Sequence, residues 1–354
     1  MDKIGRIFEK AAKLGGQKPD VLKKAAGFFV LSGQWERAVP LLKEALEFQP
    51  DDQELQLRLA GSYVGAGMDD EAIRIFTQLS KANPLDPQMH DALAELYQKK
   101  GNWERAAGAL KQAILLDPND PRRQSQLALI LLDRLHKPAE AETVLEEASA
   151  RFPWVLEFFI WRGVAMSQSG KTAEAFKFFQ RMETEFQMRH PEFLTADFYF
   201  HFGAVAEQAG NIDRAVQLLR KSENLDPSQA ARTWNYIGYM WADRGMHLKE
   251  SEDLVCKALE TEPENAAYLD SLGWVYYQTR RYEEALTKLL KAAELLTSPD
   301  EVVYDHIGDT YSRLGNQVQA LNYWRKAAEL NPQDKRIVAK IDQMVESLAK
   351  KSSE

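Results

Sequence analysis

Few residue groups in this sequence have the types and spacing of a chemical site. The segment Ser169–Thr172 reads SGKT and is similar to the end of a phosphate-binding loop. Such a loop also needs a preceding strand and a glycine five residues before Gly170, where this chain has Ala165. We therefore interpret SGKT as a turn between two helices and expect no nucleotide site there.

The other reactive side chains form no familiar catalytic or metal-binding pattern. The six histidines are scattered without metal-ligand spacing. The single cysteine, Cys256, can form neither an internal disulfide nor a zinc site by itself. We find no nucleophile–base arrangement. The sequence thus predicts a protein that is not an enzyme and has no catalytic residues, bound metal or cofactor.

Composition narrows the class of protein and of partner. The 354 residues are 45% hydrophobic and 28% charged, which is typical of an ordered chain. A net charge of −8 disfavours nucleic-acid partners, which need a basic face. No apolar run is long enough for a membrane helix, so we expect no membrane insertion. We predict a cytoplasmic chain, or one of the periplasm or envelope if an export signal has been removed.

A repeat organises the whole chain. Three residue types recur in one phase, each at intervals of 34 positions: Gly33, Gly67 and Gly101; Pro50, Pro84 and Pro118; Ala38, Ala72 and Ala106. Each type suits one place in a helical hairpin: glycine ends a first helix, proline ends a second helix, and small residues allow two helices to cross closely. With some drift the pattern continues to the C-terminus. We count nine units, beginning near Pro19, Gln53, Pro87, Pro121, Leu156, Ala196, Ala231, Ala266 and Glu301.

These residues resemble the tetratricopeptide repeat family, and the later units are similar to those of its bacterial members. The segments "YLDSLGWVYYQTRRYEEALTKLLKAAEL" from Tyr268 and "YDHIGDTYSRLGNQVQALNYWRKAAELNP" from Tyr304 are similar to its consensus, and the resemblance covers residues 19–334. It implies an all-α solenoid, a right-handed superhelix of about nine hairpins with a capping helix at each end. It also implies a protein–protein interaction scaffold or adaptor that binds its partner in a concave groove lined by the first helices.

Departures from the repeat suggest how the chain is divided. The fourth unit has Leu135 in place of the turn glycine and one extra residue, and the seventh has one extra residue near His247. The stretch Thr184–Thr195 adds about five residues. It is either a longer helix and loop, which repeats tolerate, or a hinge near residue 190. We predict a capping helix at 1–18, a first array of five units at 19–190, a second array at 191–334 and a capping helix at 335–354.

The family's groove positions single out one face. In units one to four these positions are mixed and polar, whereas in units five to eight they are rich in aromatic side chains. Such a stripe is either buried core or a set of interface anchors. We predict partner binding at Ile160, Trp161, Val164, Phe200, His201, Asn235, Tyr236, Tyr239, Asp270, Trp274 and Tyr277.

The chemistry of this face predicts the kind of partner. Apolar anchors of an extended or helical protein segment would stack on the rings. Acidic side chains at the rim favour a segment with Lys or Arg: Asp197, Glu207, Asp243, Asp270, Asp305 and Asp309. The resemblance leaves two alternatives open: a recruitment subunit of a bacterial envelope enzyme complex, such as a protease or cell-wall enzyme, and self-association through an end cap.

Overall fold

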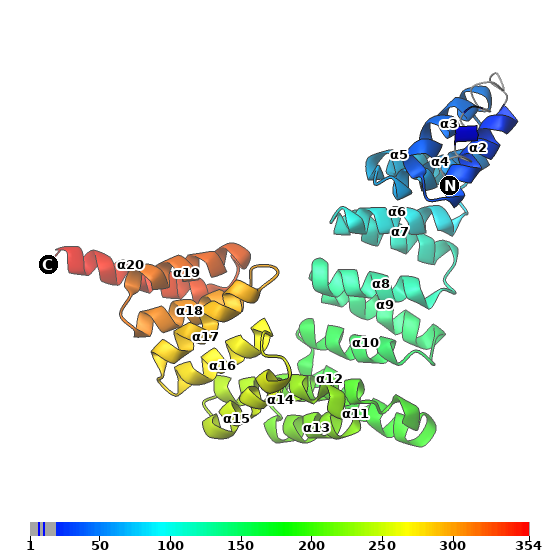
Figure 1. Ribbon diagram of the computed structural model, residues 1–354. Helices are drawn as coiled ribbons and strands as arrows, with labels where there is room; N and C mark the ends of the chain where they lie inside the picture. Colours follow the sequence, from blue (N-terminus) through cyan, green and yellow to red (C-terminus); the bar gives the residue numbers. More distant parts are fainter. Residues whose placement is uncertain (1–5, 8–9, 11–18, 354) are drawn as a thin grey trace. The chain divides into compact units, whose positions relative to one another are not determined.

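The computed structural model describes residues 6–7, 10 and 19–353, and within these ranges every regular element is a helix. The helices follow one another in nine pairs, each joined by a short turn (Figure 1). The pairs are α2 (Pro19–Leu31) and α3 (Trp35–Phe48), α4 (Gln53–Gly65) and α5 (Asp69–Ala82), α6 (Pro87–Lys99) and α7 (Trp103–Leu116), α8 (Pro121–Leu129) and α9 (Pro138–Arg151), α10 (Leu156–Gln168) and α11 (Thr172–Arg189), α12 (Ala196–Gln208) and α13 (Ile212–Leu225), α14 (Ala230–Asp243) and α15 (Leu248–Thr261), α16 (Ala266–Gln278) and α17 (Tyr282–Leu295), and α18 (Glu301–Arg313) and α19 (Gln317–Leu330).

This confirms the predicted all-α array of nine hairpins. Each first helix begins within one residue of the position that the repeat predicts. A final helix, α20 (Lys335–Ser353), covers the last hairpin as expected, and its Ile337 is buried beside Leu321 and Trp324. The predicted N-terminal helix falls on residues of which the structure describes only 6, 7 and 10, so it stays a prediction.

The chain forms two compact units, Met1–Ala175 and Phe176–Glu354. The division between them lies inside α11, whereas the boundary predicted from the sequence near residue 190 lies just beyond that helix. The hinge near residue 190 stays a prediction. The inserted stretch itself extends α11 to 18 residues and then forms a 3₁₀ turn, η2 (Pro191–Phe193), in which the Phe193 ring packs on Phe186 with ring centres 5.2 Å apart.

Local sequence signals explain where the helices begin and end. The side chain of Asp52 accepts a hydrogen bond from the backbone N–H of Leu55 and caps α4, as an acidic residue at this position should. In seven hairpins a glycine in the left-handed conformation ends the first helix; Gly67, at φ +72°, is one of them. In the eighth hairpin this position is occupied by Arg280, at φ +64°.

The fourth hairpin departs from the prediction. We expected Leu135 to replace the turn glycine, but Leu135 has an ordinary φ of −102° and the left-handed residue is His136, at φ +51°. The extra residue is absorbed in a π-helical turn, η1 (Ile130–Arg134), where the backbone N–H of Leu135 donates to the carbonyl of Ile130, five residues earlier. In the seventh hairpin the extra residue is His247, also left-handed, at φ +45°.

Small residues sit where paired helices cross, as predicted, with alanine in the first four hairpins and glycine in the last five. Ala60 and Ala94 are almost completely buried. In the second compact unit the crossing glycines lie close to side chains of the paired helix. A methyl group added to Gly308 would lie 2.4 Å from the Trp324 ring, well inside contact distance.

Within the part of the chain that the structure describes, no helix combines the length and apolar character needed to cross a bilayer.

Candidate functional site

The first helices α12, α14 and α16 position eight of the eleven predicted partner-binding residues, all in the second compact unit, and α18 packs beside them. Phe200, Asp270 and Trp274 are buried. The other five are partly exposed: His201, Asn235, Tyr236, Tyr239 and Tyr277. This surface, which we call the first-helix face, is therefore part core and part accessible surface.

The centre of the face is a stack of rings around a buried polar pair. His306 of α18 and Asp270 of α16 lie 2.9 Å apart, from imidazole Nδ1 to carboxylate Oδ1. The indole of Trp274 stacks on the His306 ring with centres 4.0 Å apart, and Tyr277 stacks on Trp274 at 4.6 Å. The Arg313 Nε–H donates to the Tyr277 hydroxyl over 3.1 Å. The aromatic side chains are thus fixed by neighbours before any partner arrives.

The electrostatics of this centre favour a charged pair. Burial alone would lower the pKa of His306, but the carboxylates of Asp270, Asp305 and Asp309 outweigh it and raise that pKa. Burial raises the pKa of the nearby Tyr239 hydroxyl, and the charges of Asp243 and Asp270 add to the effect. Tyr239 therefore offers a neutral hydroxyl group at this face.

Beside this centre, α20 contributes a cation to the same face. Lys340 lies 2.7 Å from carboxylate oxygens of both Asp305 and Asp309 of α18. The Trp324 indole N–H also donates to Asp309 over 3.0 Å. Burial raises the pKa of Asp309 despite the ammonium group, and the charge of Asp305 acts in the same direction. The last helix is therefore an electrostatic part of the face as well as a cap.

Towards α12 the face is organised around Phe200. The Arg232 guanidinium lies 3.6 Å from the Phe200 ring centre, within cation–π range, and pairs with Asp197 at 3.2 Å. Tyr236 packs edge-on against Phe200 at 5.4 Å. Burial, with a smaller contribution from Arg232, lowers the pKa of His201 to about 4, so this imidazole is neutral at pH 7.

Two polar atoms of this face lack a hydrogen-bond partner within the described chain. They are the buried Asn235 Oδ1, an acceptor on α14, and the buried Trp274 Nε1–H, a donor on α16. Buried polar atoms are nearly always paired in folded proteins, so two unpaired atoms on adjacent helices mark an unusual place.

The remaining predicted residues lie in the first compact unit. On α10, Ile160 is buried, while Trp161 and Val164 are partly exposed. Trp161 packs against the hydrophobic core of that unit. The structure therefore assigns the eleven predicted residues to two separate compact units.

The predicted acidic rim is largely neutralised by groups of the chain itself. Glu207 accepts a hydrogen bond from the Tyr236 hydroxyl, with the two oxygens 3.1 Å apart, and also pairs with Arg244. The carboxylates of Asp197, Asp270, Asp305 and Asp309 also have partners, as described above. Asp243 is exposed and has no hydrogen bond or ion pair within the described chain. Because most of these carboxylates already have partners within the chain, they favour a basic partner less than the sequence suggested.

His306, Arg313 and Lys340 belong to this face but were not among the predicted partner-binding residues. His306 is only 5% exposed. A small signal existed, because His306 lies 36 positions after Asp270, close to one repeat length, which places the two side chains on neighbouring first helices. The SGKT segment is the turn between α10 and α11, as predicted, and Lys171 pairs there with Glu142.

Three family models, each describing a tetratricopeptide repeat, match residues 29–96, 90–123 and 181–344. Together with the hairpin geometry, these matches decide the family. The chain belongs to the tetratricopeptide repeat family.

Among the described residues, no group of three or more His, Cys, Asp or Glu side chains is placed to hold a metal ion.

Two curated relatives of this tetratricopeptide repeat chain come from Pseudomonas aeruginosa. The type IV pilus assembly protein PilF is 30% identical over 136 residues, which are 38% of this chain and 53% of PilF. The TPR repeat-containing protein PA4667 is 27% identical over 171 residues, which are 48% of this chain and 28% of that protein. The matched regions thus span about half of PilF and less than a third of PA4667.

Solved structures agree on the fold. A tetratricopeptide repeat protein from Parabacteroides merdae superposes with a TM-score of 0.57 at 18% identity, over 73% of this chain and 99% of that one. Yeast Tom70 gives 0.51 at 17% identity, over 98% and 85%. A monomeric mutant of IFIT1 with m7Gppp-AAAA gives 0.58 at 17% identity, over 95% and 84%. At these identities the likeness concerns the fold alone.

Proposed function

We propose that this tetratricopeptide repeat protein is a non-enzymatic scaffold that holds a segment of a partner protein on the first-helix face of the second compact unit. The observation that carries the proposal is the row of partly exposed tyrosines, Tyr236, Tyr239 and Tyr277, which neighbouring rings hold in place. Rings that are fixed in advance lose little side-chain entropy on binding. Tyr and Trp are also frequent anchors at protein interfaces.

The unpaired polar atoms support an extended segment as the occupant. Asn235 Oδ1 can accept a main-chain N–H and Trp274 Nε1–H can donate to a main-chain carbonyl, after a small movement of the covering side chains. The main-chain N–H and C=O groups of an extended segment could form hydrogen bonds with this acceptor and this donor. The apolar side chains of the segment would then contact the tyrosine rings. No cofactor is needed for such binding.

The test is a comparison of two matched double variants. N235A/Y239A removes the acceptor and one ring from the first-helix face, whereas N224A/Y323A removes the same residue types from the second helices α13 and α19. Proteins that the wild-type chain captures from a lysate of its source organism should be lost with the first variant and kept with the second. Circular dichroism should show that both variants fold. Equal capture by both variants would contradict the proposal.

A second candidate is a recruitment subunit of a bacterial envelope assembly, favoured by the similarity to PilF, whose name describes type IV pilus assembly. Cell fractionation of the source organism, followed by in-cell crosslinking, separates the candidates. Recovery in the periplasm or envelope, crosslinked to an envelope enzyme or assembly component, would support the second candidate. Recovery in the cytoplasm alone would exclude it.

A further inference from the structure

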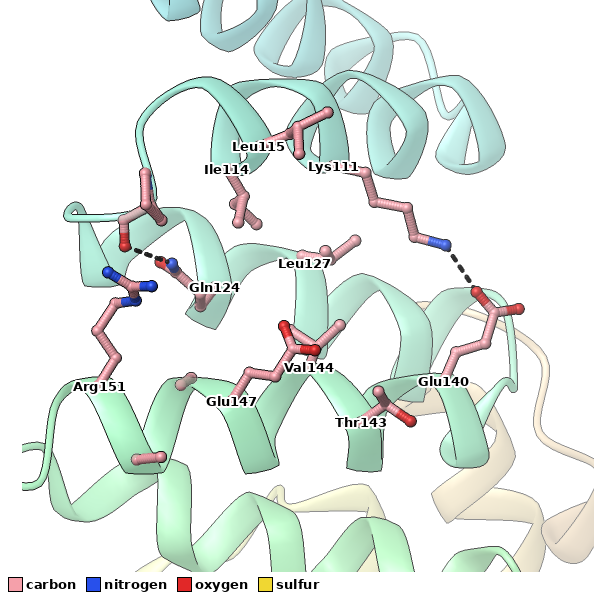
Figure 2. A pocket seen from close by; sticks show the side chains of 13 residues that line it. Lys111, Ile114, Leu115, Gln124, Leu127, Glu140, Thr143, Val144, Glu147 and Arg151 are labelled. Atoms are coloured by element: carbon pink, nitrogen blue, oxygen red, sulfur yellow. Dashed lines mark hydrogen bonds and ion pairs between the residues drawn. The ribbon is translucent and has the colours of Figure 1, made fainter.

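A second surface, separate in sequence from the first-helix face, lies wholly in the first compact unit. A groove of about 920 Å³ runs between the second helices α7 and α9, with α8 as its floor (Figure 2). The floor and walls are apolar where Ile114, Leu127 and Val144 meet. Leu115 at the edge is 75% exposed and adds to this apolar surface.

The groove belongs to the irregular fourth hairpin. The same helix that supplies its floor, α8, continues into the π-helical turn η1. Isolated π-helical turns are often found at functional sites. The extra residue lowers the stability of the helix, which a purely structural repeat has no reason to accept. This irregularity of the repeat is therefore consistent with a role for the hairpin beyond stacking.

One carboxylate of the groove has no polar partner. Glu147 of α9 is an exposed residue whose carboxylate points into the groove beside Val144 (Figure 2). Within the described chain it has neither an ion pair nor a hydrogen bond, whereas Lys111 and Glu140 at one end of the groove pair with each other at 2.7 Å. The Gln124 Oε1 atom, buried at the floor, also lacks a partner. Arg151, at the other end of the groove, donates to Asn119 over 3.3 Å. Between the two ends, the free carboxylate of Glu147 is complementary to an apolar segment that carries one cation.

The length and backbone chemistry of the groove favour a helix as its occupant. Its lining on α9 runs from Glu140 to Arg151, about 16 Å at 1.5 Å per residue, which matches about three helical turns. A bound extended segment would need polar partners for its main-chain groups along its length, and the floor and walls of this groove are apolar where Ile114, Leu127 and Val144 meet. A helix satisfies its own backbone and needs only side-chain contacts.

We propose that the α7–α9 groove is a docking site for an amphipathic helix of a partner protein, whose apolar stripe covers Ile114, Leu115 and Val144 and whose central Lys or Arg pairs with Glu147. This site is independent of the first-helix face. If both sites operate, the protein can hold two partner segments, one on each compact unit.

The probe is a pair of synthetic helical peptides of about 14 residues, each with a leucine stripe of period 3.6 and either one lysine or one glutamate at the stripe centre. Fluorescence anisotropy should show the lysine peptide binding the wild type about tenfold more tightly than the glutamate peptide. E147K should reverse this preference. E157K, which makes the same charge change at an exposed position on α10, should not.

The apolar contact is tested separately. L115S should weaken both peptides about tenfold, whereas L85S, at a leucine that is 78% exposed outside the groove, should leave both unchanged. Methyl resonances of Ile114, Leu127 and Val144 should shift when the lysine peptide is added. Absence of these shifts at millimolar peptide, shifts confined to α12–α18, or a preference that survives E147K would each overturn the proposal.

Discussion

His201 and His306 both lie on first helices of the second compact unit, but their pKa values are shifted in opposite directions. The pKa of His306 is raised, so its pairing stabilises the fold at low pH and is lost as pH rises through the raised value. The pKa of His201 is lowered to about 4, so between pH 6.5 and pH 4 the unfolded chain binds a proton at this residue and the folded chain does not. The free energy of unfolding therefore falls as the solution is acidified over this range.

We predict that H201Q removes an acid-sensitive loss of stability. At pH 5, the lowered pKa should cost the wild type about 2 kcal/mol of unfolding free energy relative to pH 8. Urea unfolding of both proteins at pH 5 and pH 8 measures the difference. The variant should lose about 2 kcal/mol less than the wild type on going from pH 8 to pH 5, after any constant effect of the substitution is subtracted. Equal losses would show that folding does not lower the pKa of His201.

A second prediction concerns the left-handed turn residue of the eighth hairpin. Arg280 has a left-handed conformation that destabilises a non-glycine residue by about 1–2 kcal/mol. Glycine adopts this conformation without strain, but its greater freedom in the unfolded chain offsets part of the gain. R280G should therefore stabilise the protein by about 0.5–1 kcal/mol, measured as an increase in the denaturation midpoint. R280A, which removes the same charge but keeps the strain, should give no such gain.

At the scale of the helix pair, the crossing distance sets which small residue is allowed. G308A should destabilise the protein by about 1–3 kcal/mol, because the new methyl group would overlap Trp324. The same substitution at Gly61 of α4 has no atom within 4 Å of the new methyl group, and should stabilise by about 1 kcal/mol through helix propensity. Thermal unfolding of the two variants should thus give shifts of opposite sign. Shifts of the same sign would contradict the crossing-distance explanation.

The helix pairs are also the level at which the sequence predicted most. Residues such as Gly67 and Pro84 act through local backbone geometry, which a sequence pattern records directly, and so the starts of the first helices were found to within one residue. The His306–Asp270 pair was missed because it depends on how two neighbouring first helices face each other. The groove beside Leu115 was missed because only first helices were considered as binding surfaces.

At the scale of the whole molecule, α20 should stabilise the second compact unit alone. Deleting residues 335–354 would expose Leu321 and Trp324 and leave Asp305 and Asp309 without their lysine. We expect faster amide hydrogen exchange in α18 and α19 and no change in α2–α9, because repeat arrays lose stability nearest the exposed end. Light scattering would detect self-association through the uncovered surface. I337D provides the same disruption without shortening the chain, and unchanged exchange in both variants would contradict this role of α20.

The glycine crossings also limit how this protein can be re-engineered. Consensus repeat proteins are often lengthened by inserting identical hairpin cassettes, on the assumption that any hairpin fits any place. Here the crossing lies within one hairpin, because Gly308 of α18 faces Trp324 of α19. A first helix copied alone from the first compact unit would place Ala60 or Ala94 against that ring, where a methyl group does not fit. Extra hairpins should therefore be copied whole, with both helices taken from the same hairpin.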